Sequence, residues 1–128
     1  MIHDEIVTFE VAKLAKEKGF PQDVFGTCEM KSSCYLEDGR FYKDGCIYPI
    51  ENAYTAPTQS LLQRWLREEK KISVEVSWFE VGKKYFWVVK DMNNHDVFKP
   101  NTTKCMTFYD TWEQALESGL KYALKELK

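Results

Sequence analysis

Residues 72–92, ISVEVSWFEVGKKYFWVVKDM, decide the fold class. Over 72–78, apolar and polar residues alternate, which is the period of a β-strand that buries one face. Gly82 lies in a short turn, and the return segment 85–89 is apolar on both faces. A strand of that kind is typical of a central position with a helix on one side. The segment therefore predicts an antiparallel hairpin within a mostly antiparallel sheet.

The first part of the chain predicts a helix and a shorter hairpin. Thr8 is a suitable N-cap for a helix over 9–18, and Gly19 supplies the left-handed residue that ends it. Residues 34–43 have the pattern of two short strands joined by a turn that contains glycine. The segment 47–54 carries a proline among bulky apolar residues, so we expect an extended arm that lies on the core.

The last helix is the best specified element of the sequence. Thr111 and Gln114 have the spacing of a capping box, and Asp110 with Glu113 offers the same pattern one residue earlier. One apolar stripe follows at the helical period, formed by Trp112, Leu116, Gly119, Leu120, Ala123, Leu124 and Leu127. Glycine disfavours a helix interior, so Gly119 predicts a close approach of this helix to the sheet. Before it, residues 93–96 have loop chemistry, and 102–109 predict a further strand.

A middle helix over 58–71 begins after Pro57, within APTQSLLQRWLREEKKI. Its predicted apolar arc consists of Leu61, Leu62, Trp65 and Leu66. The opposite side carries Gln59, Gln63, Arg64, Arg67, Lys70 and Lys71. A core helix with a solvated face explains most of this pattern. The basic face also allows a nucleic-acid contact through Gln63, Arg64, Arg67, Lys70 and Lys71, because glutamine and arginine read bases and phosphates.

Length and charge limit the choice of fold and partner. A chain of 128 residues is one domain in length, and its net charge of −2 argues against a partner bound by field alone. We expect a single α+β domain over 1–128, with two layers and about three helices packed mainly on one face of the sheet. The acidic start MIHDEIVTFEVAKL has no secretion signal, and no segment is apolar enough to span a bilayer, so we expect a cytoplasmic protein without a membrane partner.

Motifs for catalysis, metals and cofactors are weak. The four cysteines, Cys28, Cys34, Cys46 and Cys105, lack the paired spacing of zinc ligands. In a reducing compartment they are expected as thiols, and their role stays open. The carboxylate pairs are adjacent in sequence and point in different directions, and no glycine-rich phosphate loop occurs. We therefore expect no metal site, no cofactor and no enzymatic activity.

Aromatic residues gather between positions 35 and 54. They are Tyr35, Phe41, Tyr42, Tyr48 and Tyr54. Tyrosine provides contact area at low entropic cost, so this group is a candidate surface for a protein partner. Core packing of an irregular arm explains the same residues and is the preferred interpretation. A monomer and a homodimer are both compatible with the sequence.

Three segments carry a resemblance to known sequences. TFEVAKLAKEKGF, APTQSLLQRWLREEKKI and TWEQALESGLKYALKEL together resemble a family of short uncharacterised proteins of gut Bacteroides-type bacteria and of their phages and prophages. The middle motif is the most specific of the three, and the last is a general amphipathic helix. The resemblance implies an accessory protein of a mobile element, and it implies no activity and no catalytic residue. A small protein-binding protein is thus the first hypothesis, and a nucleic-acid-binding protein is the second.

Overall fold

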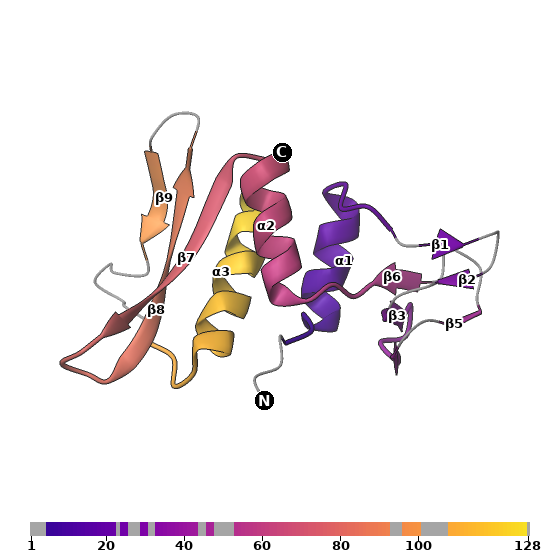
Figure 1. The fold of residues 1–128 in the computed structure, drawn as a ribbon, viewed down its shortest axis with the longest axis horizontal. Helices are drawn as coiled ribbons and strands as arrows, with labels where there is room; N and C mark the ends of the chain where they lie inside the picture. Colours follow the sequence, from indigo (N-terminus) through magenta and orange to yellow (C-terminus); the bar gives the residue numbers. More distant parts are fainter. Residues whose placement is uncertain are drawn as a thin grey trace. The chain divides into compact units, whose positions relative to one another are not determined.

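The computed structural model describes residues 5–22, 24–25, 29–30, 33–43, 46–47, 53–92, 96–100 and 108–127. Its elements are, in order, α1 (Phe9–Glu17), β1 (Val24–Phe25), β2 (Glu29–Met30), β3 (Cys34–Leu36), β4 (Phe41–Tyr42), β5 (Cys46–Ile47), β6 (Ala53–Thr55), α2 (Gln59–Glu69), β7 (Ile72–Phe79), β8 (Lys84–Asp91), β9 (Asp96–Pro100) and α3 (Trp112–Glu126) (Figure 1). The chain divides into two compact units, Met1–Thr58 and Gln59–Lys128. The single domain expected from the sequence stays a prediction.

The described strands pair antiparallel throughout. They form three sheets of three strands each, in the orders β1-β2-β5, β4-β3-β6 and β7-β8-β9. The predicted α+β class and its antiparallel pairing are confirmed. The sequence indicated one sheet, whereas the strands of Met1–Thr58 are only two or three residues long and pair locally.

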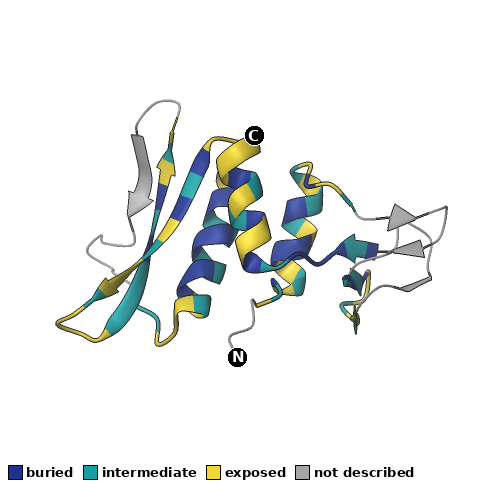
Figure 2. Cartoon of the chain, viewed as in Figure 1, coloured by how far each residue is buried: buried dark blue, intermediate teal, exposed yellow. Residues whose placement is uncertain are grey.

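The unit Gln59–Lys128 is built on the β7–β8 hairpin. The register runs without a break from Ile72 opposite Asp91 to Phe79 opposite Lys84, and β8 is the central strand, as predicted. Both α2 and α3 pack on this hairpin and on each other. Their buried sides form stripes in Figure 2. The largest fully buried side chains of this core are Leu62, Leu66, Val74, Val89, Leu120 and Leu124.

Gly119 marks the closest approach of α3 to the sheet. A Cβ atom placed on Gly119 would lie 2.9 Å from Cγ1 of Val74 and 3.1 Å from Cβ of Trp87. Real Cβ atoms essentially never come within 3.0 Å of a neighbour, so no larger residue fits without movement. The predicted reason for glycine within the apolar stripe is confirmed.

The predicted capping box at the start of α3 is also present. The hydroxyl of Thr111 accepts a hydrogen bond from the Gln114 backbone N–H at 3.1 Å, and the Gln114 side chain accepts one from the Thr111 N–H at 3.3 Å. These two bonds satisfy N–H groups that have no partner within the helix. The capping box therefore forms between Thr111 and Gln114, and α3 does not use the alternative between Asp110 and Glu113.

In the unit Met1–Thr58, α1 begins and ends as predicted. The Thr8 hydroxyl accepts from the Val11 N–H, and Gly19 has a φ of 97°. The N–H of Gly19 donates to the carbonyl of Lys16, and that of Phe20 donates to the carbonyl of Ala15. This pair of bonds is the Schellman arrangement, which satisfies the last carbonyls of the helix.

The short hairpin of β3 and β4 is confirmed, and β6 pairs with the other side of β3. Part of the arm expected over 47–54 is therefore a strand, because Tyr54 pairs directly with Tyr35. Residues 48–52 lie outside the described residues. A small core forms between these strands from Cys34, Leu36 and Ala53, with Tyr42 packed against it.

The third strand of the β7-β8-β9 sheet, β9, lies before the segment in which the sequence predicted a strand. Asp96, expected in a loop, is the first residue of β9 and pairs with Asp91. Residues 101–107, which cover most of the strand expected over 102–109, lie outside the described residues. Tyr109 forms an antiparallel bridge with Tyr85 on the same side of β8 as β9. Over the described residues, no helix is long and apolar enough to cross a membrane.

Candidate functional site

The polar side of α2 makes more hydrogen bonds to neighbouring elements than its sequence indicated. Gln59 is buried, and its amide donates to the Glu113 carbonyl and to the Glu117 carboxylate, both at 2.9 Å. The Gln63 amide donates to the Val74 carbonyl at 2.6 Å. Neither glutamine is therefore available to read a base edge, and the assignment of Gln59 to a solvated face was wrong. Both glutamines instead connect α2 to its neighbours.

One of the four cations on the predicted basic face forms an ion pair. Arg64 forms an ion pair with Glu68 one turn later, at 2.9 Å, so it is not the unneutralised charge that the sequence indicated. Arg67, Lys70 and Lys71 remain exposed at the end of the helix. The Lys70 ammonium lies 5.4 Å from the ring centre of Trp65, a cation–π distance. A narrower basic surface of three residues is left.

The apolar arc of α2 is also narrower than predicted. Leu62 and Leu66 are fully buried, whereas Leu61 is 51% exposed and Trp65 is only partly buried. The helix packs on β7 and α3 through the 62–66 ridge, which leaves the flanks of the arc outside the contact. The expectation that all four residues lie in the core was therefore wrong for Leu61.

The candidate aromatic residues between 35 and 54 serve largely within the Met1–Thr58 unit. The rings of Tyr35 and Tyr54 lie edge-on against Phe9, with centroids 5.7 and 5.8 Å away. The Tyr35 hydroxyl donates to the Val7 carbonyl at 2.7 Å. Phe41 contacts the Tyr35 ring at 5.1 Å and is 43% exposed. Tyr42 packs on the small core, and Tyr48 lies outside the described residues.

A second aromatic group lies at the turn end of the β7–β8 hairpin, and sequence reasoning missed it. We name Trp78, Tyr85 and Trp112 the aromatic shelf. Trp78 and Tyr85 are cross-strand partners with ring centroids 5.0 Å apart, and the Tyr85 ring lies 6.3 Å from that of Trp112 at 84°. Trp78 is 51% exposed and Trp112 is 44% exposed. The sequence placed both tryptophans on buried stripes, and this expectation was wrong.

Both exposed tryptophans lie at the ends of their elements. Trp78 is the penultimate residue of β7 and lies on the same face as the buried Val74. Trp112 is the first residue of α3. The apolar alternation of β7 therefore continues into the exposed end of the strand. Sequence patterns report which face a residue occupies, and they do not report where the covering element stops.

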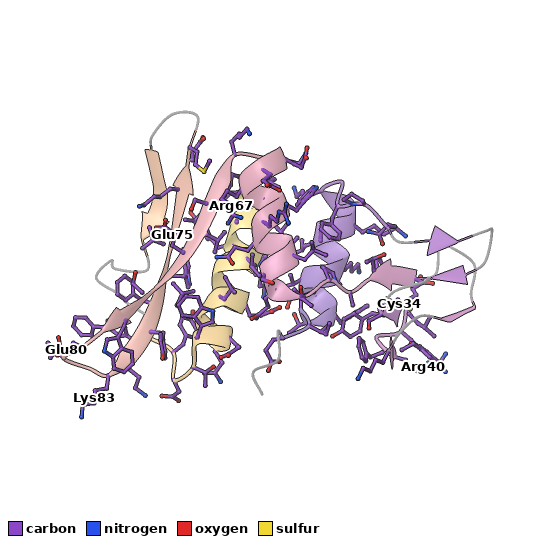
Figure 3. The ribbon with its side chains drawn as sticks, viewed as in Figure 1. Cys34, Arg40, Arg67, Glu75, Glu80 and Lys83 are labelled. Atoms are coloured by element: carbon purple, nitrogen blue, oxygen red, sulfur yellow. The ribbon has the colours of Figure 1, made fainter. Side chains whose placement is uncertain are left out.

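The opposite face of the same hairpin carries three phenylalanines. Phe79 stacks on Phe108 at 4.9 Å, and Phe86 meets Phe108 edge-on at 6.3 Å. In the turn itself, Val81 is 88% exposed. Glu80 and Lys83, labelled in Figure 3, lie at this end of the hairpin. Aromatic and aliphatic surface therefore surrounds the turn on both faces.

Polar contacts hold the elements that carry the aromatic shelf. Lys84 forms an ion pair with Asp110 just before α3, and Lys90 pairs with Glu75 on the opposite face of the hairpin at 3.2 Å. The Tyr109 hydroxyl bonds to the Ser118 hydroxyl at 2.8 Å and fastens the segment before α3 to the helix. The shelf therefore rests on a hairpin and a helix start that several polar contacts hold in place.

Two titrating groups are shifted by their surroundings. The backbone N–H of Arg40 lowers the pKa of Asp38, and the Arg40 guanidinium adds to this effect. Burial raises the pKa of Tyr122, and the nearby Glu126 carboxylate raises it further. Asp38 lies in the β3–β4 turn and Tyr122 near the end of α3, so neither belongs to the aromatic shelf.

Metal ligands are not grouped in the part of the chain that the structure describes. No cluster of three or more histidine, cysteine, aspartate or glutamate side chains there could hold an ion. Cys34 is fully buried within the small core. Cys28 and Cys105 lie outside the described residues, and the side chain of Cys46 is not described. The expectation of no metal site stays a prediction for these positions.

Comparison with known proteins identifies no relative of the chain. No protein-family profile, curated protein or solved structure matches it. Function is therefore argued from the side chains themselves.

Proposed function

We propose that the chain is a small non-enzymatic protein-binding protein whose contact surface is the aromatic shelf. The observation that supports this proposal is the exposure of two tryptophans, Trp78 and Trp112, which both contact Tyr85 at the turn end of the hairpin. Tryptophan and tyrosine are the residues most enriched among those that dominate binding energy in protein interfaces. Apolar groups that gather on a surface, in contrast to single exposed ones, mark interaction sites.

The magnitude of the available burial supports the same proposal. A half-exposed tryptophan leaves on the order of 100 Å² in water, which corresponds to about 2–3 kcal/mol if a partner covers it. Trp78 and Trp112 together can therefore contribute more than most surface contacts. Their rings are already positioned by Tyr85, so little side-chain freedom is lost on binding.

The biological setting is part of the proposal. The resemblance of the helical segments to short proteins of gut Bacteroides-type bacteria and their phages supports an accessory role in a phage or prophage. We place such a protein in the cytoplasm, where it would contact a bacterial or phage protein. The exposed ring of Phe41 in the Met1–Thr58 unit offers a second, smaller contact area.

A nucleic-acid role is the alternative function. It is favoured by the exposed cations Arg67, Lys70 and Lys71 at the end of α2. It is disfavoured by the pairing of Arg64 with Glu68 and by the use of the Gln63 amide in binding β7. Three phosphate contacts on a chain of net charge −2 provide little affinity at physiological salt.

Affinity capture with matched variants tests the proposal. The immobilised chain is exposed to a nuclease-treated lysate of its source organism, beside a variant that carries Trp78→Thr and Trp112→Gln. Threonine suits a strand and glutamine suits a helix start, so the fold is retained. Leu61→Ser serves as the control, since Leu61 is exposed to the same extent as Trp78 on another element.

The expected result is a protein held by the wild type and the Leu61 variant and lost from the double tryptophan variant. The captured protein is then identified, purified and shown to bind directly. In a parallel capture from untreated lysate, a nucleic acid that is held at low salt and lost from an Arg67→Ala variant would favour the alternative. Equal capture by all the variants would contradict the aromatic shelf as the contact.

A further inference from the structure

Along β7, the backbone N–H and C=O groups of successive residues point alternately toward β8 and away from it. Three contacts show which residues direct these groups away from β8. Strand β7 is an edge of its sheet. The N–H and the C=O of Tyr85 both bond to Tyr109, each at 2.9 Å, so they point away from β7. Tyr85 is the partner of Trp78 in the register. Trp78 therefore belongs to a pair without mutual hydrogen bonds, and its own N–H and C=O point to the outer edge.

Two further contacts agree with this assignment. The Lys71 carbonyl accepts a hydrogen bond from the Met92 N–H at 2.8 Å, so the backbone groups of Lys71 point toward β8. The Val74 carbonyl accepts from the Gln63 side chain of α2, so Val74 points outward. Alternate residues of a strand share a direction, and hence Val74, Val76 and Trp78 all present their backbone groups at the outer edge.

Only the first part of this edge is covered within the described residues. Gln63 satisfies the carbonyl of Val74, whereas Val76 and Trp78 make no hydrogen bond outside the β8 ladder among the residues that the structure describes. Figure 1 shows β7 continuing past α2 toward the turn. The uncovered edge is therefore the same stretch that carries the aromatic shelf. Unpaired strand edges of this kind are templates for another strand.

We infer that the outer edge of β7 from Val76 to Trp78 binds an extended segment of a partner protein by strand addition. The partner's backbone pairs with Val76 and Trp78, and its alternate side chains lie over the aromatic shelf. The segment is therefore free of proline and carries β-branched or aromatic residues at every second position. This inference rests on the proposed function and names the kind of partner that the shelf takes.

A second copy of the chain fits this edge less well than a foreign segment. Antiparallel pairing of two β7 strands about Ser77 would place Glu80 of one copy opposite Val74 of the other. The Val74 carbonyl is already bonded to Gln63, and α2 packs beside it. Pairing between two copies would thus be limited to the three positions around Ser77. A free peptide can extend beyond the hairpin turn, away from α2.

Selection from a displayed library of random peptides of about nine residues tests the inference, because this length covers the edge from Val76 to Trp78 and leaves flanking residues on both sides. The full chain is the target, and the variant with Trp78→Thr and Trp112→Gln is used for counter-selection. The expected product is a group of peptides with alternating apolar residues and no central proline. No enrichment, or enrichment of sequences without this alternation, would overturn the inference.

N-methylation of a selected peptide then tests the hydrogen bonds without any change to the protein. In an antiparallel added strand, the residues whose side chains lie over the shelf also direct their N–H groups to β7. Methylating those nitrogens is expected to weaken binding by at least about tenfold, and methylating the intervening ones is expected to change it little. The reverse pattern indicates a parallel strand and equally supports strand addition. Equal effects at both sets would refute it.

Val76→Pro is the matching change in the protein. It removes an outward N–H and leaves the β8 ladder intact, as proline does on edge strands. A selected peptide should bind this variant at least about tenfold more weakly than the Val76→Thr control. If Val76→Pro does not fold, the N-methylated peptides decide the question. If no peptide is selected but lysate capture still depends on the two tryptophans, strand addition is refuted and the proposed function is not. Peptide binding without such capture refutes the proposed function.

Discussion

Replacing Gly119 by alanine tests how tightly α3 packs on the sheet. The new Cβ would lie 2.9 Å from Val74 Cγ1, 3.1 Å from Trp87 Cβ and 3.2 Å from Trp87 Cγ. Alanine gains about 1 kcal/mol of helix propensity over glycine. Overpacking a core typically costs about 1–3 kcal/mol, and here we expect about 2–3 kcal/mol because two buried side chains on neighbouring strands resist movement. We expect a net loss of about 1–2 kcal/mol in the free energy of unfolding.

Urea unfolding followed by tryptophan fluorescence measures this loss. All four tryptophans of the chain lie within Gln59–Lys128, so the signal reports on the unit that contains Gly119. Val74→Ala removes the nearest clashing atom and provides a double-mutant cycle. The combined variant should lose less stability than the sum of the two single changes, by at least about 0.5 kcal/mol. Additive losses, or a stabilised Gly119→Ala variant, would refute the close-packing argument.

Three smaller predictions concern local geometry. Lys71 has a φ of 58°, so Lys71→Gly should stabilise the chain by roughly 0.5–1 kcal/mol in thermal unfolding, and a loss of stability would contradict the assigned backbone. Thr111→Ala should destabilise it by about 1 kcal/mol through loss of the capping box, and an unchanged stability would argue against the cap. The lowered pKa of Asp38 adds stability above its unfolded pKa that is lost as pH falls through its folded pKa. In an NMR titration, Arg40→Ala should raise the pKa of Asp38 only partway to its usual value, because the larger cause is a backbone N–H that alanine keeps. A full return to the usual value would assign the effect to the guanidinium.

The parts of the fold that were predictable depend on local chemistry. Thr8, Gly19 and Thr111 act within one turn of their own helix, so their roles follow from the sequence alone. The hairpin of β7 and β8 was predictable because its alternation is long and its turn is short. Gly119 was interpretable because its position in an apolar stripe has few explanations other than close packing.

The candidate site was not predictable, because it depends on where elements end against one another. Trp78 and Trp112 continue buried patterns, but they lie at the ends of β7 and α3 and are half-exposed there. Gln59 and Gln63 lie on the polar side of α2, yet α3 and β7 offer carbonyl partners that a helix projection cannot show. The sequence therefore overestimated the basic face and overlooked the aromatic shelf.

Site-specific photo-crosslinking tests the central claim, that the turn end of the β7–β8 hairpin contacts a protein partner. Benzoyl-phenylalanine is placed at position 81, where Val81 is 88% exposed, and in a separate control at position 61, where Leu61 is 51% exposed. Both variants are irradiated in cells of the source organism. We predict a discrete covalent adduct with a protein from position 81 and none from position 61. No adduct at position 81, or the same adducts at both positions, would contradict the claim.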